Sequence, residues 1–129
     1  MGLENRLEEL NRAAVRIARE VAGDKCLVAG NLSLTWMYEP NSPSAADRVR
    51  KTFDEQLAVQ VDEGVDFIIG ETFSWLGEAL IAVERAKKTG LPVMVTICFE
   101  NKDKTADGKS APESAKALLD AGADIVGMN

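Results

Sequence analysis

Apolar runs alternate with amphipathic stretches along the whole chain. In residues 65–69, four of the five side chains are apolar and no polar alternation occurs, which is typical of a strand covered on both faces. Similar runs begin near residues 26, 93 and 124. Between the runs, apolar residues recur at every third or fourth position, which predicts helices. Because strands and helices alternate strictly, the pattern favours a parallel sheet with right-handed crossovers.

Capping residues mark where the predicted helices begin. We expect Ser44, with Asp47 three residues later, to cap the second helix, and Ser74 to cap the third. Residues 110–113 read Ser-Ala-Pro-Glu, a capping box with proline in the first turn of the fourth helix. The first helix carries an apolar stripe that we expect to pack inward, formed by Leu3, Leu7, Leu10, Ala14, Ile17 and Val21.

The whole chain, residues 1–129, is interpreted as a single domain in which one helix precedes a β-α-β-α-β-α-β series. Two α/β architectures accommodate this series. One is an open flavodoxin-like sheet, and the other is a partial (β/α)8 (TIM) barrel, about half of a fold that takes about 250 residues. We favour the partial barrel, because the helices are similarly amphipathic and no glycine-rich phosphate loop follows the first strand. Four strands would leave two open edges, so either two copies associate or the chain is a piece of a longer protein.

A carboxylate follows the most apolar strand. That strand is expected to end at Gly70, and Glu71 stands where the backbone leaves the sheet, at the edge where parallel α/β folds bind ligands. The segment 64–71 aligns with 122–129, so that Glu71 falls on Asn129, and a looser copy ends on Asn31. Glu71 is therefore a candidate binding residue. The competing interpretation is a carboxylate that only caps a helix or a turn.

Composition and charge exclude several classes of partner. The net charge of −6 and the pI near 4.7 disfavour nucleic acid and anionic membranes, which need a basic face. No apolar run approaches the roughly 20 residues that cross a bilayer, and the charged amphipathic amino end predicts a cytosolic protein. With no histidine and two cysteines, the chain cannot build the usual zinc site from its own residues. Cys26 and Cys98 are expected at opposite ends of the sheet, as buried thiols rather than ligands.

Two long loops differ in what they predict. Residues 31–40 form a polar and aromatic loop, in which Trp36 and Tyr38 either line a pocket or only cover the end of the barrel. Residues 100–109 read as a solvated charged loop, to which we assign no chemistry.

Four blocks in order and spacing resemble the homocysteine S-methyltransferase family, which includes betaine–homocysteine methyltransferase and the homocysteine module of methionine synthase. The blocks are Val-Ala-Gly-Asn-Leu-Ser-Leu-Thr at 28–35 with Tyr38, Val-Asp-Phe-Ile-Ile-Gly-Glu-Thr-Phe at 65–73, Gly-Leu-Pro-Val at 90–93, and Gly-Ala-Asp-Ile-Val-Gly-Met-Asn at 122–129.

The resemblance implies a (β/α)8 barrel that holds zinc on three cysteine thiolates. In such enzymes the zinc keeps the homocysteine sulfur as a thiolate, which attacks the methyl group of a small donor to give methionine. The family glutamate that receives the amino group of homocysteine falls on Glu71, and Asn31, Thr72 and Asn129 become candidate substrate-binding residues. Thr72 stands where the betaine branch tends to have an aromatic residue, so the methyl donor stays open.

The sequence also departs from the family pattern. The first zinc cysteine of the family follows the asparagine that matches Asn129, and the later cysteine pair and the early Asp-Gly motif have no counterpart here. The resemblance therefore implies the middle of an enzyme, strands three to six, which is inactive alone. The alternative is a half-barrel module without chemistry that pairs with itself, as a homo-oligomer, or with a partner chain through its exposed edges.

Overall fold

The computed structural model describes residues 2–99 and 103–129, so that residues 100–102 of the predicted charged loop lie outside the described residues. A short 3-10 turn, η1 (Glu4–Arg6), leads into the first helix. The elements that follow are α1 (Leu7–Ala22), β1 (Ala29–Ser33), α2 (Pro43–Asp62), β2 (Phe67–Phe73), α3 (Leu76–Lys87), β3 (Val93–Ile97), α4 (Ala111–Asp120) and β4 (Ile125–Met128).

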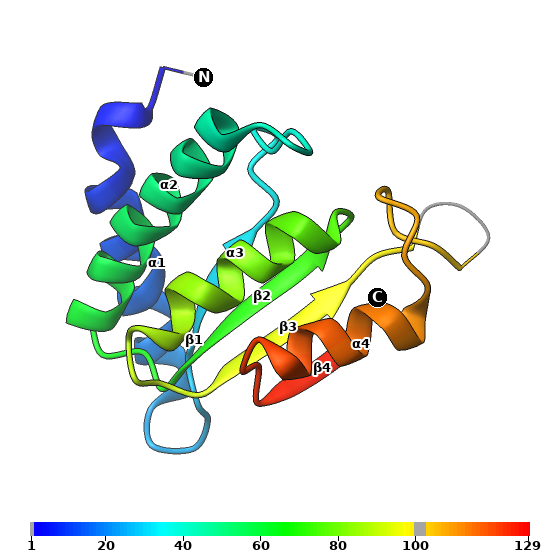
Figure 1. Ribbon diagram of the computed structural model, residues 1–129. Coiled ribbons are helices and arrows are strands. Elements are labelled where there is room, and N and C mark those ends of the chain that lie inside the picture. Colours follow the sequence, from blue (N-terminus) through cyan, green and yellow to red (C-terminus); the bar gives the residue numbers. More distant parts are fainter. Residues whose placement is uncertain (1, 100–102) are drawn as a thin grey trace.

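The four strands form one parallel sheet in the order β1-β2-β3-β4 (Figure 1). Strands that are neighbours in sequence are thus neighbours in space, and each is joined to the next by a helix. This consecutive order is that of a (β/α) barrel, whereas an open flavodoxin-like sheet places later strands on both sides of the first. The predicted α/β fold of parallel (β/α) units is confirmed, and β1 and β4 are its two edges.

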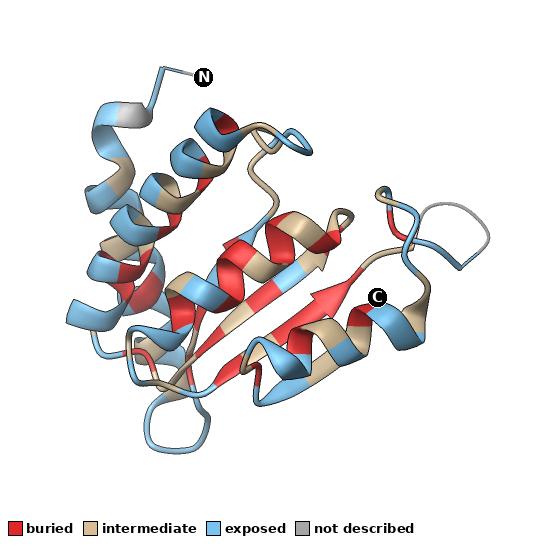
Figure 2. Cartoon of the chain, viewed as in Figure 1, coloured by how far each residue is buried: buried red, intermediate tan, exposed pale blue. Residues whose placement is uncertain are grey.

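The core lies between the helices and one face of the sheet. In β1, Gly30 and Leu32 are buried whereas Asn31 and Ser33 are exposed, so that only one face of the strand is covered. Buried residues likewise line the inner sides of α2 and α3 (Figure 2). Phe53 of α2 meets Phe73 of β2 edge-to-face, with 6.2 Å between ring centroids. The sheet therefore keeps a second, open face.

The first helix packs through a different side from the one predicted. Val15 is its buried residue, whereas Ile17 and Val21 are 63% and 84% exposed. On the side of Val15, Arg12 and Arg16 both form ion pairs with Glu63 at the end of α2, and the expected stripe faces outward. The inward orientation predicted for that stripe, made of Leu3, Leu7, Leu10, Ala14, Ile17 and Val21, is wrong for most of its members.

Two of the predicted helix caps are also wrong. The side chain of Ser42, not Ser44, accepts a hydrogen bond from the backbone N–H of Ala45, because Pro43 takes the first helical position of α2. The first N–H groups of α3 are capped by Asp107, from the loop before α4, and not by Ser74. The capping box predicted at residues 110–113 is confirmed.

The two cysteines differ in how far their surroundings match the prediction. β1 begins at Ala29, so Cys26 lies in the preceding turn and is exposed, and its prediction as a buried thiol is wrong. Cys98 follows β3 at the opposite end of the sheet, as expected, and is half-buried. Along the described part of the chain, no helix combines the length and the apolar character that a membrane crossing requires.

Candidate functional site

Polar side chains from all four strands meet at the carboxyl edge of the sheet, on its open face. We call this set the polar row, and it consists of Asn31 from β1, Glu71 and Thr72 from β2, Thr96 from β3, and Asn129 directly after β4. Three hydrogen bonds join its members across the sheet. The four residues expected to bind substrate, Asn31, Glu71, Thr72 and Asn129, are thus brought together by the fold.

Glu71 is held by the strand beside it. The amide Nδ2 of Asn31 donates to Oε1 of Glu71 at 2.6 Å, and the hydroxyl of Ser33 donates to the backbone carbonyl of Glu71 at 3.3 Å. The register places Ser33 directly opposite Glu71. The side chain of Glu71 stays exposed on the open face, with one carboxylate oxygen fixed and its other lone pairs available.

A bulge in β2 puts two consecutive side chains on the same face. Gly70 pairs with Val95 and Phe73 with Ile97, so β2 has one residue more than β3 across this interval. The extra residue lets Phe73 return to the helix-covered face although Glu71 and Thr72 both belong to the polar row. β2 therefore extends two residues beyond Glu71, and the prediction that Gly70 ends the strand is wrong.

Thr72 links the second strand to the third and fourth. Its backbone φ is 62°, an unusual value for a β-branched residue. Its N–H donates to the hydroxyl Oγ1 of Thr96 at 3.2 Å, and its own hydroxyl accepts from Nδ2 of Asn129 at 3.1 Å. Sequence reasoning did not single out Thr96, although one signal marks it: it is the only hydroxyl residue in the apolar run of β3.

Glu71 gives the polar row a negatively charged hydrogen-bond acceptor that has no cationic partner among the described residues. Among residues 2–99 and 103–129, no lysine or arginine forms an ion pair with Glu71. A carboxylate with free lone pairs binds an ammonium group through a charge-assisted hydrogen bond. The neighbouring amides and hydroxyls supply both donors and acceptors, so that the row suits a small zwitterionic ligand.

A small aromatic cavity lies at the same edge of the sheet. Trp36, Tyr38, Trp75 and Glu78 are among the residues that line its volume of about 110 Å³. The buried carboxylate of Glu78 accepts hydrogen bonds from the N–H and the hydroxyl of Thr35, at 2.8 and 2.6 Å, and so fixes the loop that carries Trp36 and Tyr38. The two aromatic residues line a cavity, although Trp36 itself is 90% exposed.

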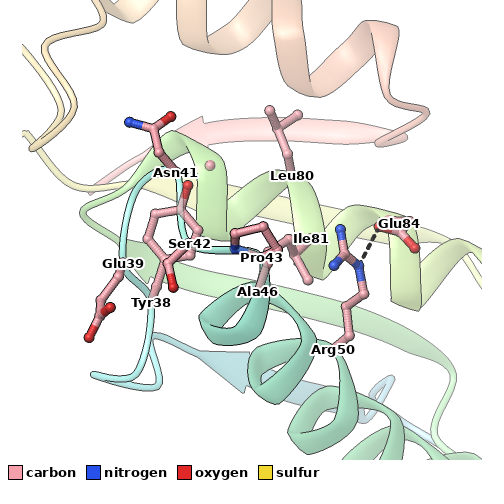
Figure 3. Close-up of a pocket in the computed structure, with 11 residues that line it drawn as sticks. Tyr38, Glu39, Asn41, Ser42, Pro43, Ala46, Arg50, Leu80, Ile81 and Glu84 are labelled. Atoms are coloured by element: carbon pink, nitrogen blue, oxygen red, sulfur yellow. Dashed lines mark hydrogen bonds and ion pairs between the residues drawn. The ribbon is translucent and has the colours of Figure 1, made fainter.

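A larger hollow of about 410 Å³ lies between α2 and α3 on the outer, helical layer (Figure 3). Arg50 and Glu84 form an ion pair at one end of it, with 3.2 Å between nitrogen and oxygen, and Tyr38 forms part of the other end. Burial and the nearby carboxylates of Asp107 and Glu78 raise the pKa of Tyr38. The strand-edge residues of the polar row do not line this hollow.

Among residues 2–99 and 103–129, the cysteines and carboxylates do not form a metal centre. In the part of the chain that the structure describes, no three cysteine, aspartate, glutamate or histidine side chains come together. Cys26 and Cys98 lie at opposite ends of the sheet. The described residues thus do not fit a zinc ion, and the chemistry of the polar row is that of hydrogen bonding and charge.

An open-faced half of a (β/α) barrel with a carboxylate at its strand edge is typical of a ligand-binding part of a barrel enzyme. The chain belongs to the homocysteine S-methyltransferase family, whose model matches residues 1–129. It is 41% identical over 128 residues to an S-methylmethionine–homocysteine S-methyltransferase of Pongo abelii, covering 98% of this chain and 34% of that protein. It is 42% identical over 123 residues to betaine–homocysteine S-methyltransferase 1 of Danio rerio, covering 95% of this chain and 30% of the relative. The chain thus spans about a third of the length of these curated relatives.

Solved structures show the same fold. The homocysteine methyltransferase MmuM from Escherichia coli superposes with a TM-score of 0.74 at 17% identity, over 100% of this chain and 52% of that one. A sugar phosphate isomerase/epimerase from Parabacteroides distasonis gives a TM-score of 0.52 at 14% identity, over 89% of this chain and 46% of that one. The chain therefore has the fold of about half of the first protein.

Proposed function

We propose that the chain is the central part, strands three to six, of a homocysteine S-methyltransferase that forms methionine. Family membership supports the reaction class. The observation that carries the assignment to this part of the molecule is Glu71, an exposed carboxylate held at 2.6 Å by Asn31 with no cation bound to it among the described residues.

In this proposal the polar row binds the amino acid end of homocysteine. Glu71 accepts hydrogen bonds from the ammonium group, and the amides of Asn31 and Asn129 fix the position of the row by bonding Glu71 and Thr72. Binding the amino acid at its charged end also orients its sulfur, so that the reacting atom is presented in one direction.

The reaction itself transfers a methyl group from an atom of the donor to the sulfur of homocysteine. The homocysteine sulfur, as a thiolate, attacks the methyl carbon of the donor. A new carbon–sulfur bond forms, and the bond between the methyl group and its former carrier breaks, with the electron pair leaving on that carrier. The relatives are named for betaine and for S-methylmethionine, so the donor of this chain stays open between such compounds and others.

Zinc is proposed to serve as cofactor from outside this chain. When bound, zinc removes the thiol proton at neutral pH and keeps the sulfur nucleophilic. Because no suitable cluster occurs among the described residues, the proposal places the ligands on other segments of a complete enzyme and makes the 129-residue chain inactive alone. A cytosolic location is proposed because free thiols such as Cys26 and Cys98 persist in reducing compartments.

The test compares the chain with the protein encoded by its entire source reading frame. The expected result is stoichiometric zinc and formation of methionine from homocysteine in the full-length protein, and neither in the chain alone. Zinc analysis and detection of methionine with several candidate donors measure both. If the purified chain retained one zinc and methylated homocysteine, the proposal that it is a central part would be wrong. If the full-length protein bound zinc but methylated no homocysteine with any donor, the reaction class would be wrong.

Exposed apolar surface favours a second candidate, a non-catalytic half-barrel module that pairs with itself. A hollow of about 430 Å³ beside α4 and β4 is lined largely by apolar residues, among them Ile97, Phe99 and Leu119. Ile125 and Met128 on the β4 edge are 55% and 68% exposed. A strand edge and an apolar groove of this kind suit a second copy of the chain.

Light scattering coupled to size exclusion, at several concentrations, tests this candidate. A well-defined dimer that Ile125→Lys converts to a monomer would support the module. A stable monomer at all concentrations, or undefined aggregation, would contradict it. Ala13→Lys, at an exposed position of α1, adds the same charge and is the matched surface control.

A further inference from the structure

We propose that Thr96 is a positioning residue for the substrate-binding carboxylate. Its hydroxyl group holds the backbone of Thr72 in a left-handed conformation, and this conformation keeps Glu71 and Thr72 on the same face of the sheet. The inference rests on the proposed function, because it assigns Glu71 to the ammonium group of the amino acid substrate.

The conformation of Thr72 requires an external partner. A φ of 62° lies in the region that favours glycine, and a branched Cβ makes it more costly. Such conformations persist only where the surrounding structure holds them, and they gather at functional sites. Thr72 stands directly after the candidate ligand-binding residue Glu71.

Thr96 supplies that partner inside the sheet. In a bulge, the extra residue has no ladder partner on the neighbouring strand. Here the N–H of Thr72 donates to Oγ1 of Thr96 at 3.2 Å, and the regular ladder resumes one residue later, where the carbonyl of Phe73 accepts from the N–H of Cys98 at 2.9 Å. Thr96 is only 9% exposed, so that water does not readily replace its hydroxyl.

The hydrogen bond between Thr72 and Thr96 also affects the candidate ligand site, because Thr72 is itself a member of the polar row. While the bulge is held, the hydroxyl of Thr72 accepts from Asn129 at 3.1 Å and Glu71 stays opposite Ser33, within reach of Asn31. If the N–H of Thr72 lost its acceptor, the bulge would relax toward a regular ladder, in which consecutive side chains face opposite sides. Either Glu71 or Thr72 would then leave the polar row.

This arrangement predicts an effect on substrate binding rather than on the methyl transfer step. Thr96→Val keeps the size of the side chain and removes its hydroxyl. In the full-length protein we expect the homocysteine KM to rise about five- to tenfold, the range of one neutral hydrogen bond, with kcat and zinc content unchanged. Thr96→Ser restores the hydroxyl and should restore the KM.

Thr89→Val is the matched control. The hydroxyl of Thr89 accepts from the N–H of Leu91, also at 3.2 Å, and donates to the carbonyl of Ala86 at 2.7 Å, before the amino end of β3 and away from the polar row. A general loss of stability would raise the KM equally in Thr96→Val and Thr89→Val, and this outcome would overturn the inference. An unchanged KM in Thr96→Val would overturn it as well.

Glu71→Gln, measured in parallel, separates the two proposals. If Glu71→Gln raises the KM but Thr96→Val does not, only the role of Thr96 is wrong. If Glu71→Gln leaves the KM unchanged, the proposed role of the polar row in binding homocysteine is wrong, and so is the role of Thr96. Amide hydrogen exchange on the 129-residue chain gives a second readout: Thr96→Val, or Thr96→Ala if the first does not fold, should accelerate exchange at Thr72 while Cys98 stays protected. Equal acceleration at both amides would contradict the inference.

Discussion

The guanidinium group of Arg16 holds the carboxylate of Glu63 through two hydrogen bonds of 2.8 Å each, and so joins α1 to α2. Arg12, one helical turn earlier, donates to the same carboxylate at 2.7 Å. These bonds connect the inward side of α1 to the end of α2, and they lower the pKa of Glu63 to about 2.

This pKa predicts how stability depends on pH. Because the folded-state pKa of Glu63 lies below its unfolded value of about 4.3, the carboxylate contributes stability above the unfolded value and loses it as pH falls through the folded one. We expect the free energy of unfolding of the wild type to fall more steeply than that of Glu63→Gln between about pH 4.3 and pH 2. Urea unfolding at a series of pH values measures both. Parallel pH profiles for the two proteins would show that the Arg16–Glu63 pair does not form in solution.

Gly77 in α3 has no space for a side chain. A Cβ at this position would overlap the hydroxyl group of Tyr38. Alanine normally favours a helix over glycine by about 1 kcal/mol, so a loss of stability in Gly77→Ala would report the packing clash alone. We expect Gly77→Ala to destabilise the chain by about 1–3 kcal/mol. The clash should disappear in the Tyr38→Ala background, where Gly77→Ala becomes neutral or stabilising. A double-mutant cycle from urea unfolding tests this coupling, and additive effects would contradict it.

Glu71→Gln removes the negative charge of the polar row but keeps its size. In the full-length protein, the homocysteine KM should rise about 10- to 100-fold, as expected for a lost charge-assisted hydrogen bond, with zinc content unchanged. Steady-state kinetics and metal analysis measure both quantities. Glu55→Gln, at an exposed position of α2, is the control and should leave both unchanged. Loss of zinc in Glu71→Gln with retained homocysteine affinity would refute the assigned role.

Asp107 caps α3 from a distant part of the chain. Its two carboxylate oxygens accept from the N–H groups of Leu76 at 3.1 Å and Gly77 at 3.2 Å. Asp107→Ala should therefore cost about 1 kcal/mol of stability and speed amide exchange at both positions. Ser74→Ala removes the residue that the sequence suggested as the cap, and it should leave exchange at Leu76 unchanged. The reverse pattern would show that Ser74 is the cap in solution.

The order of elements could be predicted because it depends on coarse physical patterns. Apolar runs predict strands and helical periodicity between them predicts crossovers, although the cover expected on both faces of the strands is present on only one. The repeated Gly-x-Asp segments at the start of β2 and β4 also proved structural. Asp66 accepts from the N–H of Val28 at 2.6 Å, and Asp124 accepts from the N–H of Val93 at 2.8 Å. Each aspartate thus pairs the start of its own strand with the strand before it.

Details that depend on tertiary contacts could not be predicted. The side of α1 that faces inward carries Arg12 and Arg16, whose contact with Glu63 joins residues about 50 positions apart in the sequence. The site residues Asn31, Glu71, Thr72 and Asn129 were found because polar residues end apolar strands. Thr96 was missed because it lies within such a strand, where a single hydroxyl does not interrupt the apolar pattern. Its importance depends on the bulge, and nothing local in the sequence marks the left-handed backbone of Thr72.

The extra residue in β2 also limits which changes in length this chain can accept. Substitutions leave the alternation of faces intact, but loss of one residue between Gly70 and Phe73 would remove the bulge and restore a regular ladder, in which Phe73 still faces the helices. The ring of Phe73 would keep its contact with Phe53, but one polar side chain instead of two would face the open side of the sheet at this point. Among relatives, a strand shortened by one residue at this point would therefore keep its core and its glutamate but lack the hydroxyl that accepts from Asn129.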